Sequence, residues 1–325
     1  MRNKLTQKTK KAFSLIEVIF VLVILGIVAS ISSQIIVQVY ENYIMQRATY
    51  NVSTKTELAV NQIVNRLSYR IQGTTISKRH KDFVDGSAGA NSWLKLEDVT
   101  TGTDYTTIEW IGYDNDSLAA SATPNWSGIA NYETNASVNG FDSPGSNLNA
   151  VATIMRNLSK TIKFPDGKVD LTNSKPAALL FAENNNFYNG DNTYNPLCMG
   201  LIPEDGNSST DCIFRVQQNG NTGFSFLDGK PKIITERYKL AWSAYALVPE
   251  RQDNGQFDLI LHSNYQPWNG ESYMDTNTTR NTLLKNITVF KFSETGGVIN
   301  FKLCASENIG QDFNITTCKQ KVVIR

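Results

Sequence analysis

The sequence predicts an α+β protein in which one long N-terminal helix precedes a mostly antiparallel β domain. Apolar residues recur at helical spacing from the N-terminus to about residue 72, and no proline occurs before Pro124. Short apolar runs separated by Gly- and Asn-rich turns fill the second half of the chain. Such short connections indicate hairpins and therefore antiparallel pairing.

The N-terminus has the features of a membrane segment. Residues 1–12 contain five basic residues and no acid, which keeps them cytoplasmic and directs the following segment outward. The apolar run from Phe13 to about Ile31 approaches the roughly 20 residues that a spanning helix needs. Glu17 lies inside it, where a charge costs on the order of a few kcal/mol near the bilayer centre. Glu17 is therefore a candidate functional residue.

Two ordinary interpretations of this segment are possible. A cleaved signal peptide also has a basic start and an apolar middle, and Val28-Ala29-Ser30 is compatible with its small-residue cleavage site. A signal anchor would need no cleavage. A signal peptide gives no reason for the helical pattern to continue past the apolar run to about residue 72.

The residues around Ala12 favour a third interpretation. The stretch Ala12-Phe13-Ser14-Leu15-Ile16-Glu17-Val18 resembles the cleavage and methylation motif of type IV pilins and type II secretion pseudopilins. The family usually has Gly where this chain has Ala12. The resemblance implies cleavage between Ala12 and Phe13 by a prepilin peptidase, N-methylation of Phe13 and a role for Glu17 in assembly. It also implies a pilin-like fold, with the large insertions of the bulkier minor subunits.

Elementary electrostatics agrees with that role for Glu17. After cleavage, Phe13 would carry a free amine at a helix N-terminus, with Glu17 one turn away on the same face. The helix dipole favours a carboxylate there. In a filament the carboxylate can instead meet the amine of a neighbouring subunit, because a buried charge without a partner is strongly destabilising. In a single chain, Glu17 could also reach the cytoplasmic interface.

We divide the chain into four segments. Residues 1–12 form a leader, 13–33 the membrane-spanning part of the helix, 34–73 its amphipathic continuation, and 74–325 a periplasmic or extracellular β domain. Gly73 is the expected C-cap. A helix from about 14 to 72 would be roughly 90 Å long at 1.5 Å per residue.

Within the β domain the pattern predicts a short helix at 150–161 and a loop at 125–149. Strands are expected at 105–113, 177–182, 213–217, 224–227, 257–262, 283–292, 298–304 and 321–324, and one bent strand or two strands at 232–248. Two turns, Asn-Gly-Asn-Thr-Gly and Ser-Glu-Thr-Gly-Gly, predict hairpins.

The four cysteines predict two disulfides. Thirteen residues separate the members of each neighbouring pair, and the expected location outside the cytoplasm is oxidising. Three pairings are possible, and we favour Cys198–Cys212 with Cys304–Cys318. Each would close a short loop and contribute about 3 kcal/mol in the chain-entropy model. A zinc site is less favoured, because there is no CxxC and neither histidine is near a cysteine in the sequence.

Charge gives little support for nucleic-acid binding. Without the leader the chain has 26 basic and 30 acidic residues, a net charge of −4, so bulk attraction to a polyanion is not expected. A short basic patch at 77–82 could contact DNA or lipid headgroups through Lys78, Arg79 and Lys81. A solvated turn is the favoured interpretation.

Signals for catalysis and cofactors are absent from the sequence. There is no GxSxG, HExxH or P-loop, and His80 and His262 are expected on the surface or in loops. Acidic loops at 114–116, 204–206 and 253–255 do not match an EF-hand, so no cofactor is expected and structural calcium is a minor alternative. Trp110 and Trp242 are expected in the core, while Trp126 and Trp268 lie in polar stretches as weak ligand-contact candidates.

The sequence therefore predicts a non-enzymatic, minor pilin-like subunit of a type II secretion pseudopilus or a type IV pilus. It would sit in the bacterial inner membrane with its N-terminus cytoplasmic and its C-terminal domain periplasmic, and enter the filament at or near the tip in support of protein secretion. The implied partners are a prepilin peptidase, other pilins or pseudopilins and the inner-membrane assembly platform. Two alternatives are a DNA-uptake or substrate-binding membrane module and a secreted enzyme behind an ordinary signal peptide.

Overall fold

The computed structural model describes residues 14–89, 91–100, 104–131, 139–181, 196–202, 212–231, 234–252, 255–309 and 313–324. By their contacts they form two compact units, Met1–Asn51 with Glu307–Ile315, and Val52–Ser306 with Thr316–Arg325. The first contains the apolar part of the N-terminal helix. The second contains most of both β-sheets, described below.

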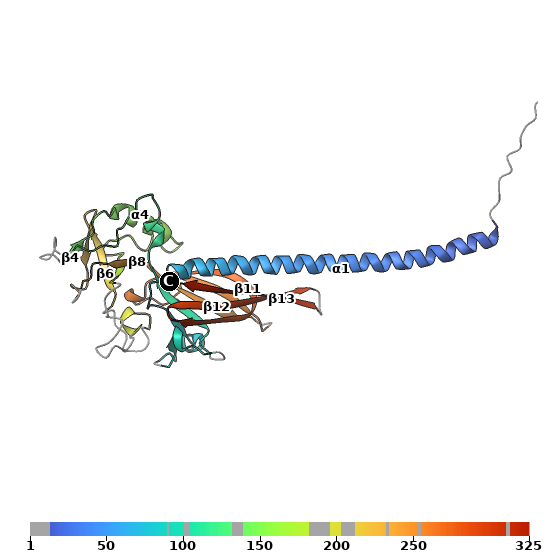
Figure 1. Cartoon of the computed structure of the whole chain (residues 1–325). Helices are drawn as coiled ribbons and strands as arrows, with labels where there is room; N and C mark the ends of the chain where they lie inside the picture. Colours follow the sequence, from blue (N-terminus) through green and yellow to red (C-terminus); the bar gives the residue numbers. More distant parts are fainter. Residues whose placement is uncertain are drawn as a thin grey trace, which may run out of the picture. The chain divides into compact units, whose positions relative to one another are not determined.

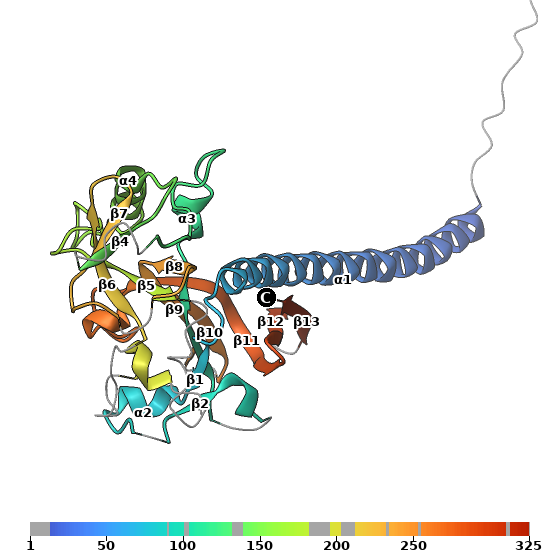
Figure 2. The same cartoon turned by 60° about the vertical axis from the view of Figure 1, so that its left-hand side comes forward.

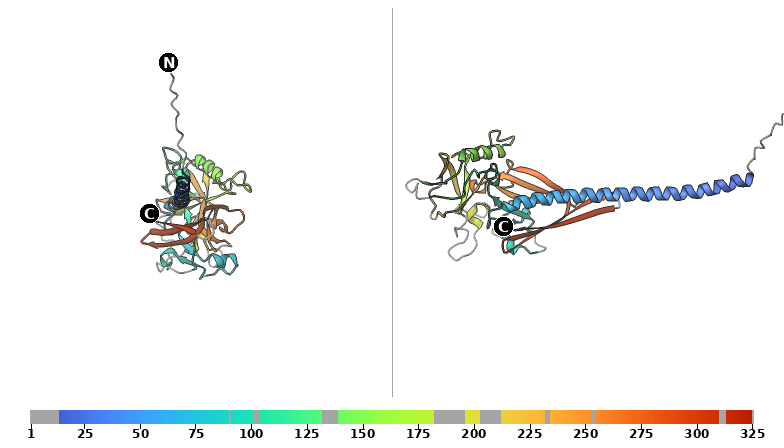
Figure 3. Two further views of the ribbon diagram at one scale, coloured as in Figure 1. Left: turned by 90° about the vertical axis from the view of Figure 1, so that its right-hand side faces the viewer. Right: turned by 45° about the horizontal axis from the view of Figure 1, so that its top comes forward.

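Helix α1 (Leu15–Ser68) is one unbroken helix of 54 residues (Figures 1 and 3). The helix ends at Ser68, four residues before the predicted end at about residue 72, because the backbone that follows forms hydrogen bonds with a strand instead. Arg70 forms an isolated antiparallel bridge with Gly112, and the Ile71 amide donates a 2.8 Å hydrogen bond to the Ile111 carbonyl. Gly73 then takes a left-handed φ of 82°, as a chain-reversing glycine rather than a helix C-cap.

The larger sheet has eight strands. Their order is β13 (Phe313–Ile324), β12 (Val298–Ile309), β11 (Thr279–Thr295), β10 (Phe257–Tyr265), β9 (Ser243–Arg251), β3 (Thr107–Gly112), β1 (Ile76–Lys78) and β2 (Trp93–Lys95). Every neighbouring pair from β12 to β2 is antiparallel. The fold is therefore α+β, as the sequence predicts.

The C-terminal part of α1 packs on this sheet. One helix face is fully buried, namely Val52, Thr56, Ala59, Val60, Ile63 and Leu67. The Glu57 carboxylate lies 3.3 Å from the ammonium groups of both Lys319 and Lys321 on β13. The Arg66 guanidinium lies 5.5 Å from the centre of the Tyr245 ring on β9. Apolar burial and these polar contacts together dock the helix.

The smaller sheet has five strands in the order β4 (Gly140–Asp142), β7 (Gly223–Phe226), β6 (Phe214–Asn219), β5 (Ala177–Phe181) and β8 (Tyr238–Ala241), all antiparallel (Figure 2). Helix α4 (Leu148–Leu158) shares its core through Leu148, Val151 and Met155. The Asn147 side chain caps α4 by accepting a hydrogen bond from the Ala150 amide. The remaining short elements are α2 (His80–Val84), α3 (Asn115–Leu118) and 3₁₀ turns at Leu96–Asp98, Pro196–Met199 and Pro267–Asn269.

The two sheets are joined at Trp242. This single residue separates β8 of the smaller sheet from β9 of the larger one, so the segment expected at 232–248 is two strands in different sheets. The side-chain Nε2 of Gln266 donates hydrogen bonds to the backbone carbonyls of Trp242 and Pro176. The Asp114 amide, just after β3, donates a 2.7 Å hydrogen bond to the Leu240 carbonyl of β8.

Most of the predicted β segments are confirmed within a few residues. The turn at 219–223 closes the β6–β7 hairpin and the turn at 295–298 closes the β11–β12 hairpin. The strand predicted at 321–324 begins earlier, at Phe313. The predictions miss β1, β2 and β4, which have three residues each and too few positions to show an alternating pattern.

Three side chains predicted outside the core are buried in it. Trp126 and Trp268 are 2% and 3% exposed, so their role as ligand-contact candidates is wrong. Trp126 stacks on Tyr238 with 5.8 Å between ring centres, and its indole N–H donates to the Asp114 carbonyl. His262 lies on β10 and is 3% exposed, so its expected surface position is also wrong. Trp110 and Trp242 are core residues, as predicted.

Candidate assembly site

The N-terminus of α1 contains a local contact that involves Glu17. Ser14 immediately precedes the helix, and Glu17 is its third residue. The Ser14 amide lies 3.4 Å from Glu17 Oε2, and the Glu17 amide donates a 3.0 Å hydrogen bond to the Ser14 carbonyl. This is one half of a capping box, in which an acid at the third position satisfies the amide of the N-cap residue. Sequence reasoning missed this role, although the spacing Ser-x-x-Glu signals it.

The predicted processing residues Ala12 and Phe13 lie outside the described residues. The structure therefore describes this site only from Ser14 and the first turn of α1 onward. A carboxylate in this turn is favoured by the helix dipole. Glu17 thus has a local stabilising role before any partner subunit is present.

The helix that follows Glu17 is apolar and uncovered. It is the one described helix long and apolar enough to cross a membrane, and none of its most apolar stretch is buried. The apolar exposure continues past the predicted membrane boundary at residue 33. It includes Ile35, Ile36, Val39, Tyr40 and Tyr43. Such a surface requires lipid or other apolar helices around it.

Both favoured disulfides are present. Cys198 pairs with Cys212, and Cys304 on β12 pairs with Cys318 on β13, with Cα–Cα distances of 5.2 and 4.0 Å. The second bond ties the edge strand to its neighbour. In the part of the chain that the structure describes, no group of three or more His, Cys, Asp or Glu side chains could hold a metal ion. The acidic loop at 204–206 lies outside that part, as do two residues of the loop at 253–255.

The basic patch at 77–82 does not form one surface, which corrects the proposed DNA contact. Lys78 is 1% exposed, and its ammonium lies 2.7 Å from Glu109 Oε2 and 4.5 Å from the centre of the Phe83 ring. It also donates to the Leu201 carbonyl. Tyr265 donates a 2.7 Å hydrogen bond to the other oxygen of Glu109. Lys78 is thus a core residue that cannot reach a nucleic acid.

The other two members of the patch differ from each other. Arg79 is half-buried, lies 4.8 Å from the centre of the Tyr105 ring and pairs with Asp82 at 3.3 Å. Lys81 is exposed. The favoured interpretation as a solvated turn is therefore also wrong for most of the patch. The sequence contained one signal of this pair. Glu109 lies inside the apolar strand predicted at 105–113, and a buried carboxylate in a strand needs a cationic partner.

Both histidines contact Tyr273. The Nδ1 atom of His262 lies 2.8 Å from the Tyr273 carbonyl oxygen, and that of His80 lies 3.3 Å from the Tyr273 hydroxyl. Burial lowers the pKa of His262 to about 4 and lowers the pKa of His80, despite the nearby Glu250 carboxylate. Both imidazoles are neutral at pH 7 and belong to the packing of this region.

Asp114 is a buried acid at the N-terminus of α3. Its Oδ1 accepts a 3.1 Å hydrogen bond from the Ser117 amide, which caps the short helix. The pKa of Asp114 is raised to about 7, mainly because the carboxyl group is buried; the hydrogen bond from the Ser117 amide opposes this rise and the charge of nearby Asp116 adds to it. The carboxyl group of Asp114 therefore binds its proton more tightly in the folded protein than in the unfolded chain. The stability that the proton provides is complete below pH 4 and is lost as the pH rises through about 7.

We predict that Asp114→Asn stabilises the protein at pH 8 and leaves it nearly unchanged at pH 4. Asparagine keeps the capping oxygen and never becomes charged, so the gain grows with pH to the order of a few kcal/mol. Thermal unfolding of the full chain in detergent at several pH values measures it. Asp166→Asn, at an exposed position, is the control and should show no such slope. A gain that did not depend on pH would contradict the prediction.

Comparison with known protein families gives a match that falls on the candidate assembly site. The model of the prokaryotic N-terminal methylation motif matches residues 7–33. The match includes Ala12, Phe13 and Glu17 and the start of the apolar helix. No curated protein and no solved structure matches the chain. A methylation motif on a membrane-length helix that leads into antiparallel sheets is consistent with a type IV pilin or a pseudopilin.

Proposed function

We propose that the protein is a minor subunit of a type II secretion pseudopilus or a type IV pilus. A prepilin peptidase cleaves it between Ala12 and Phe13 and methylates Phe13. It waits in the bacterial inner membrane with the β sheets on the periplasmic side, and then enters the filament through α1 with other pilins or pseudopilins. The methylation motif at 7–33 is the observation that carries this proposal.

The tip position rests on size. The unit that contains most of both sheets carries strands in an eight-stranded and a five-stranded sheet, which is more than a regular helical lattice accommodates easily around closely packed helices. A subunit at the end of a filament has no neighbour on one side. The bulky unit therefore fits a tip or initiating position in support of protein secretion.

The DNA-uptake alternative now has less support. It relied on Lys78, Arg79 and Lys81, of which only Lys81 is fully exposed. The two remaining side chains, Arg79 and Lys81, provide too little positive charge on one surface for a nucleic-acid interface.

Sequencing the mature N-terminus tests the proposed processing. We expect N-methylated phenylalanine at Phe13 in protein isolated from a host that has a prepilin peptidase. In a host without that peptidase, the chain should keep Met1 and remain in the membrane. A mature chain that began at Ile31 would identify an ordinary signal peptide and overturn the proposal.

A further inference from the structure

Lys78 and Glu109 hold an amine and a carboxyl group in contact inside the protein. Lys78 is on β1 and Glu109 is on β3, and the antiparallel register places both side chains on one face of the sheet, one diagonal step apart. The two side chains are 2% and 1% exposed, and Lys78 Nζ lies 2.7 Å from Glu109 Oε2. An amine and a carboxyl group in contact are the two components of an amide bond.

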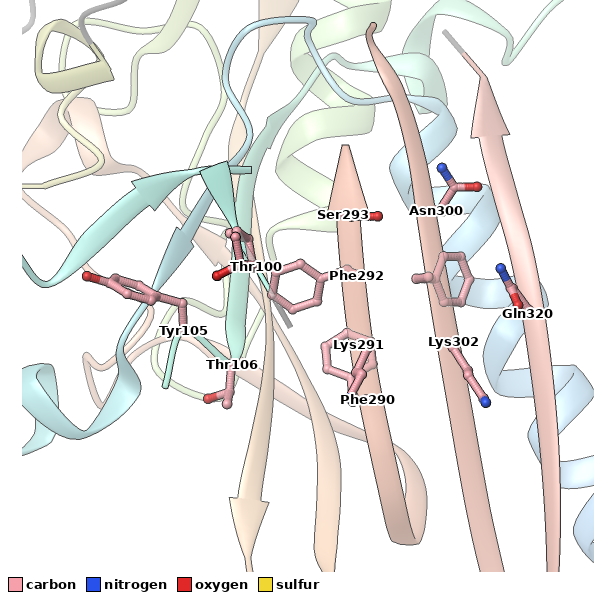
Figure 4. Close-up of a pocket in the computed structure, with 12 residues that line it drawn as sticks. Thr100, Tyr105, Thr106, Phe290, Lys291, Phe292, Ser293, Asn300, Lys302 and Gln320 are labelled. Carbon is pink, nitrogen blue, oxygen red and sulfur yellow. The ribbon is translucent and has the colours of Figure 1, made fainter. Parts of the chain in front are cut away.

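Solvent reaches the start of β3 but not Glu109. Thr106, the residue before the strand, is exposed and lines a pocket of about 370 Å³ together with Tyr105 (Figure 4). Thr107 and Glu109 are buried, and neither Glu109 nor Lys78 belongs to the lining of that pocket. The contact between amine and carboxylate is therefore separated from the water in the pocket.

The nitrogen of Lys78 is oriented by its other neighbours. It donates a hydrogen bond to the Leu201 carbonyl, and the centres of the Phe83 and Tyr273 rings lie 4.5 and 5.4 Å from it. If the ammonium gives a proton to Glu109, the hydrogen bond to Leu201 holds the nitrogen in place. The lone pair then points where that proton had been, which is toward the carboxyl group.

Tyr265 polarises the carboxyl group of Glu109. Its hydroxyl donates a 2.7 Å hydrogen bond to Oε1, the oxygen that Lys78 does not contact. Burial and the adjacent Glu109 carboxylate raise the pKa of Tyr265, so the hydroxyl keeps its proton and remains a donor. A donor at this oxygen stabilises the negative charge that develops when a nucleophile adds to the carboxyl carbon, as in an oxyanion hole.

We propose that Lys78 and Glu109 condense to an amide that joins β1 covalently to β3. The ammonium transfers one proton to Oε2, and the amine nitrogen then attacks Cδ while Tyr265 stabilises the charge on Oε1. The nitrogen gives up a second proton to Oε2, the Cδ–Oε2 bond breaks, and Oε2 leaves as water. One C–N bond replaces one C–O bond, and nothing is oxidised or reduced.

The fold favours this condensation in two ways. Two reactants held in contact react as if each were present at an effective concentration of about 10⁵–10⁸ M. The amide also replaces two buried charges, whose desolvation is costly, with a neutral group. The unfolded chain has neither advantage, so the bond should form only after folding. It would fix β1, a strand of three residues that follows α1, to the sheet independently of its hydrogen bonds.

The chain contains a second Lys–Glu pair that serves as an internal comparison. Lys168 Nζ lies 2.6 Å from Glu271 Oε2, with side chains that are 7% and 20% exposed. The Gln266 backbone amide donates to the same oxygen of Glu271, and no tyrosine hydroxyl donates to this carboxylate within the described ranges. The contact is as close, but it is less buried and has no oxyanion donor. We expect this pair to remain an ion pair.

Peptide mass spectrometry of the full chain, purified in detergent and reduced, tests the proposal. Trypsin cleaves between the two residues, after Arg79, Lys81 and Lys95, so Lys78 and Glu109 separate unless an amide joins them. We expect two linked peptides whose mass is their sum minus one water, with fragment ions that place the bond at these two side chains. The peptides of the Lys168–Glu271 pair should be separate.

Two variants test the roles of the residues. Lys78→Arg keeps the positive charge beside Glu109 but replaces the amine with a guanidinium that does not lose its proton, so no linked peptides should form. Tyr265→Phe keeps both reacting groups and the aromatic ring. It should slow the bond formation roughly a hundredfold, as expected for the loss of one oxyanion donor, measured as the linked fraction against time after pulse-labelled synthesis.

Near-ultraviolet circular dichroism checks that each protein is folded. Separate Lys78 and Glu109 peptides from the folded wild type would overturn the proposal. Linked peptides in Lys78→Arg, or the same rate in Tyr265→Phe as in the wild type, would overturn the assigned roles and the proposal with them. An equal linked fraction at the Lys168–Glu271 pair would do so too, because contact alone would then be sufficient.

Discussion

Glu17→Val and Glu17→Gln are both expected to prevent entry into filaments while the protein still accumulates in the membrane. In the proposed filament the apolar part of α1 would be surrounded by other helices, so a carboxylate there would need a cationic partner, for which we propose the Phe13 amine of a neighbour. A buried charge pair that loses one partner costs roughly 3–5 kcal/mol. Incorporation should therefore fall by at least roughly a hundredfold.

The two substitutions separate pairing from capping. Glutamine can still accept a hydrogen bond from the Ser14 amide, as Glu17 does, whereas valine cannot. If charge pairing drives assembly, both variants fail. If Glu17 acts only by starting the helix, Glu17→Gln assembles and Glu17→Val does not, which would contradict the pairing role.

The measurement is the fraction of the protein recovered in sheared filaments, compared with the fraction in membranes. Glu41→Gln is the matched control, because Glu41 is a second exposed acid on the same helix, beyond the predicted membrane segment. It should assemble like the wild type.

Lys78→Met is expected to destabilise the folded unit by roughly 3–5 kcal/mol, the usual cost of breaking a buried ion pair. The substitution leaves the carboxylate of Glu109 buried, at 1% exposure, with the Tyr265 hydrogen bond but without the ammonium of Lys78. The double substitution Lys78→Met with Glu109→Gln should recover part of the loss, since no buried charge is left and glutamine still accepts from Tyr265.

Thermal unfolding of the full chain in detergent, followed by near-ultraviolet circular dichroism, gives the comparison. Lys81→Met removes an exposed lysine three residues away and should change stability by no more than about 0.5 kcal/mol. If Lys78→Met were as stable as Lys81→Met, the ion pair would contribute nothing to the fold.

The sequence predicts well those features that depend on long or local patterns. The helix α1, the hairpins β6–β7 and β11–β12 and both disulfides follow from periodicity, turn residues and spacing. The motif at Ala12 to Val18 was readable because it is contiguous. These features need no knowledge of which distant segments meet.

The features that the sequence leaves open are set by tertiary contacts. Lys78 looked like part of a basic surface because its acid, Glu109, is 31 positions away in another strand. Trp126 and Trp268 looked exposed because their neighbours in sequence are polar. The helix end moved from 72 to 68 because strand β3 competes for the backbone of Arg70 and Ile71. No local pattern contains this information.

The position of Trp242 has a mechanical consequence. One residue spans only about 3.5 Å of extended chain, so the two sheets cannot slide apart while β8 and β9 keep their pairings. The side-chain Nε2 of Gln266, which directly follows β10, donates a hydrogen bond to the Trp242 carbonyl and so links β10 to this connection. A traction force applied to either sheet therefore reaches the other directly through covalent backbone.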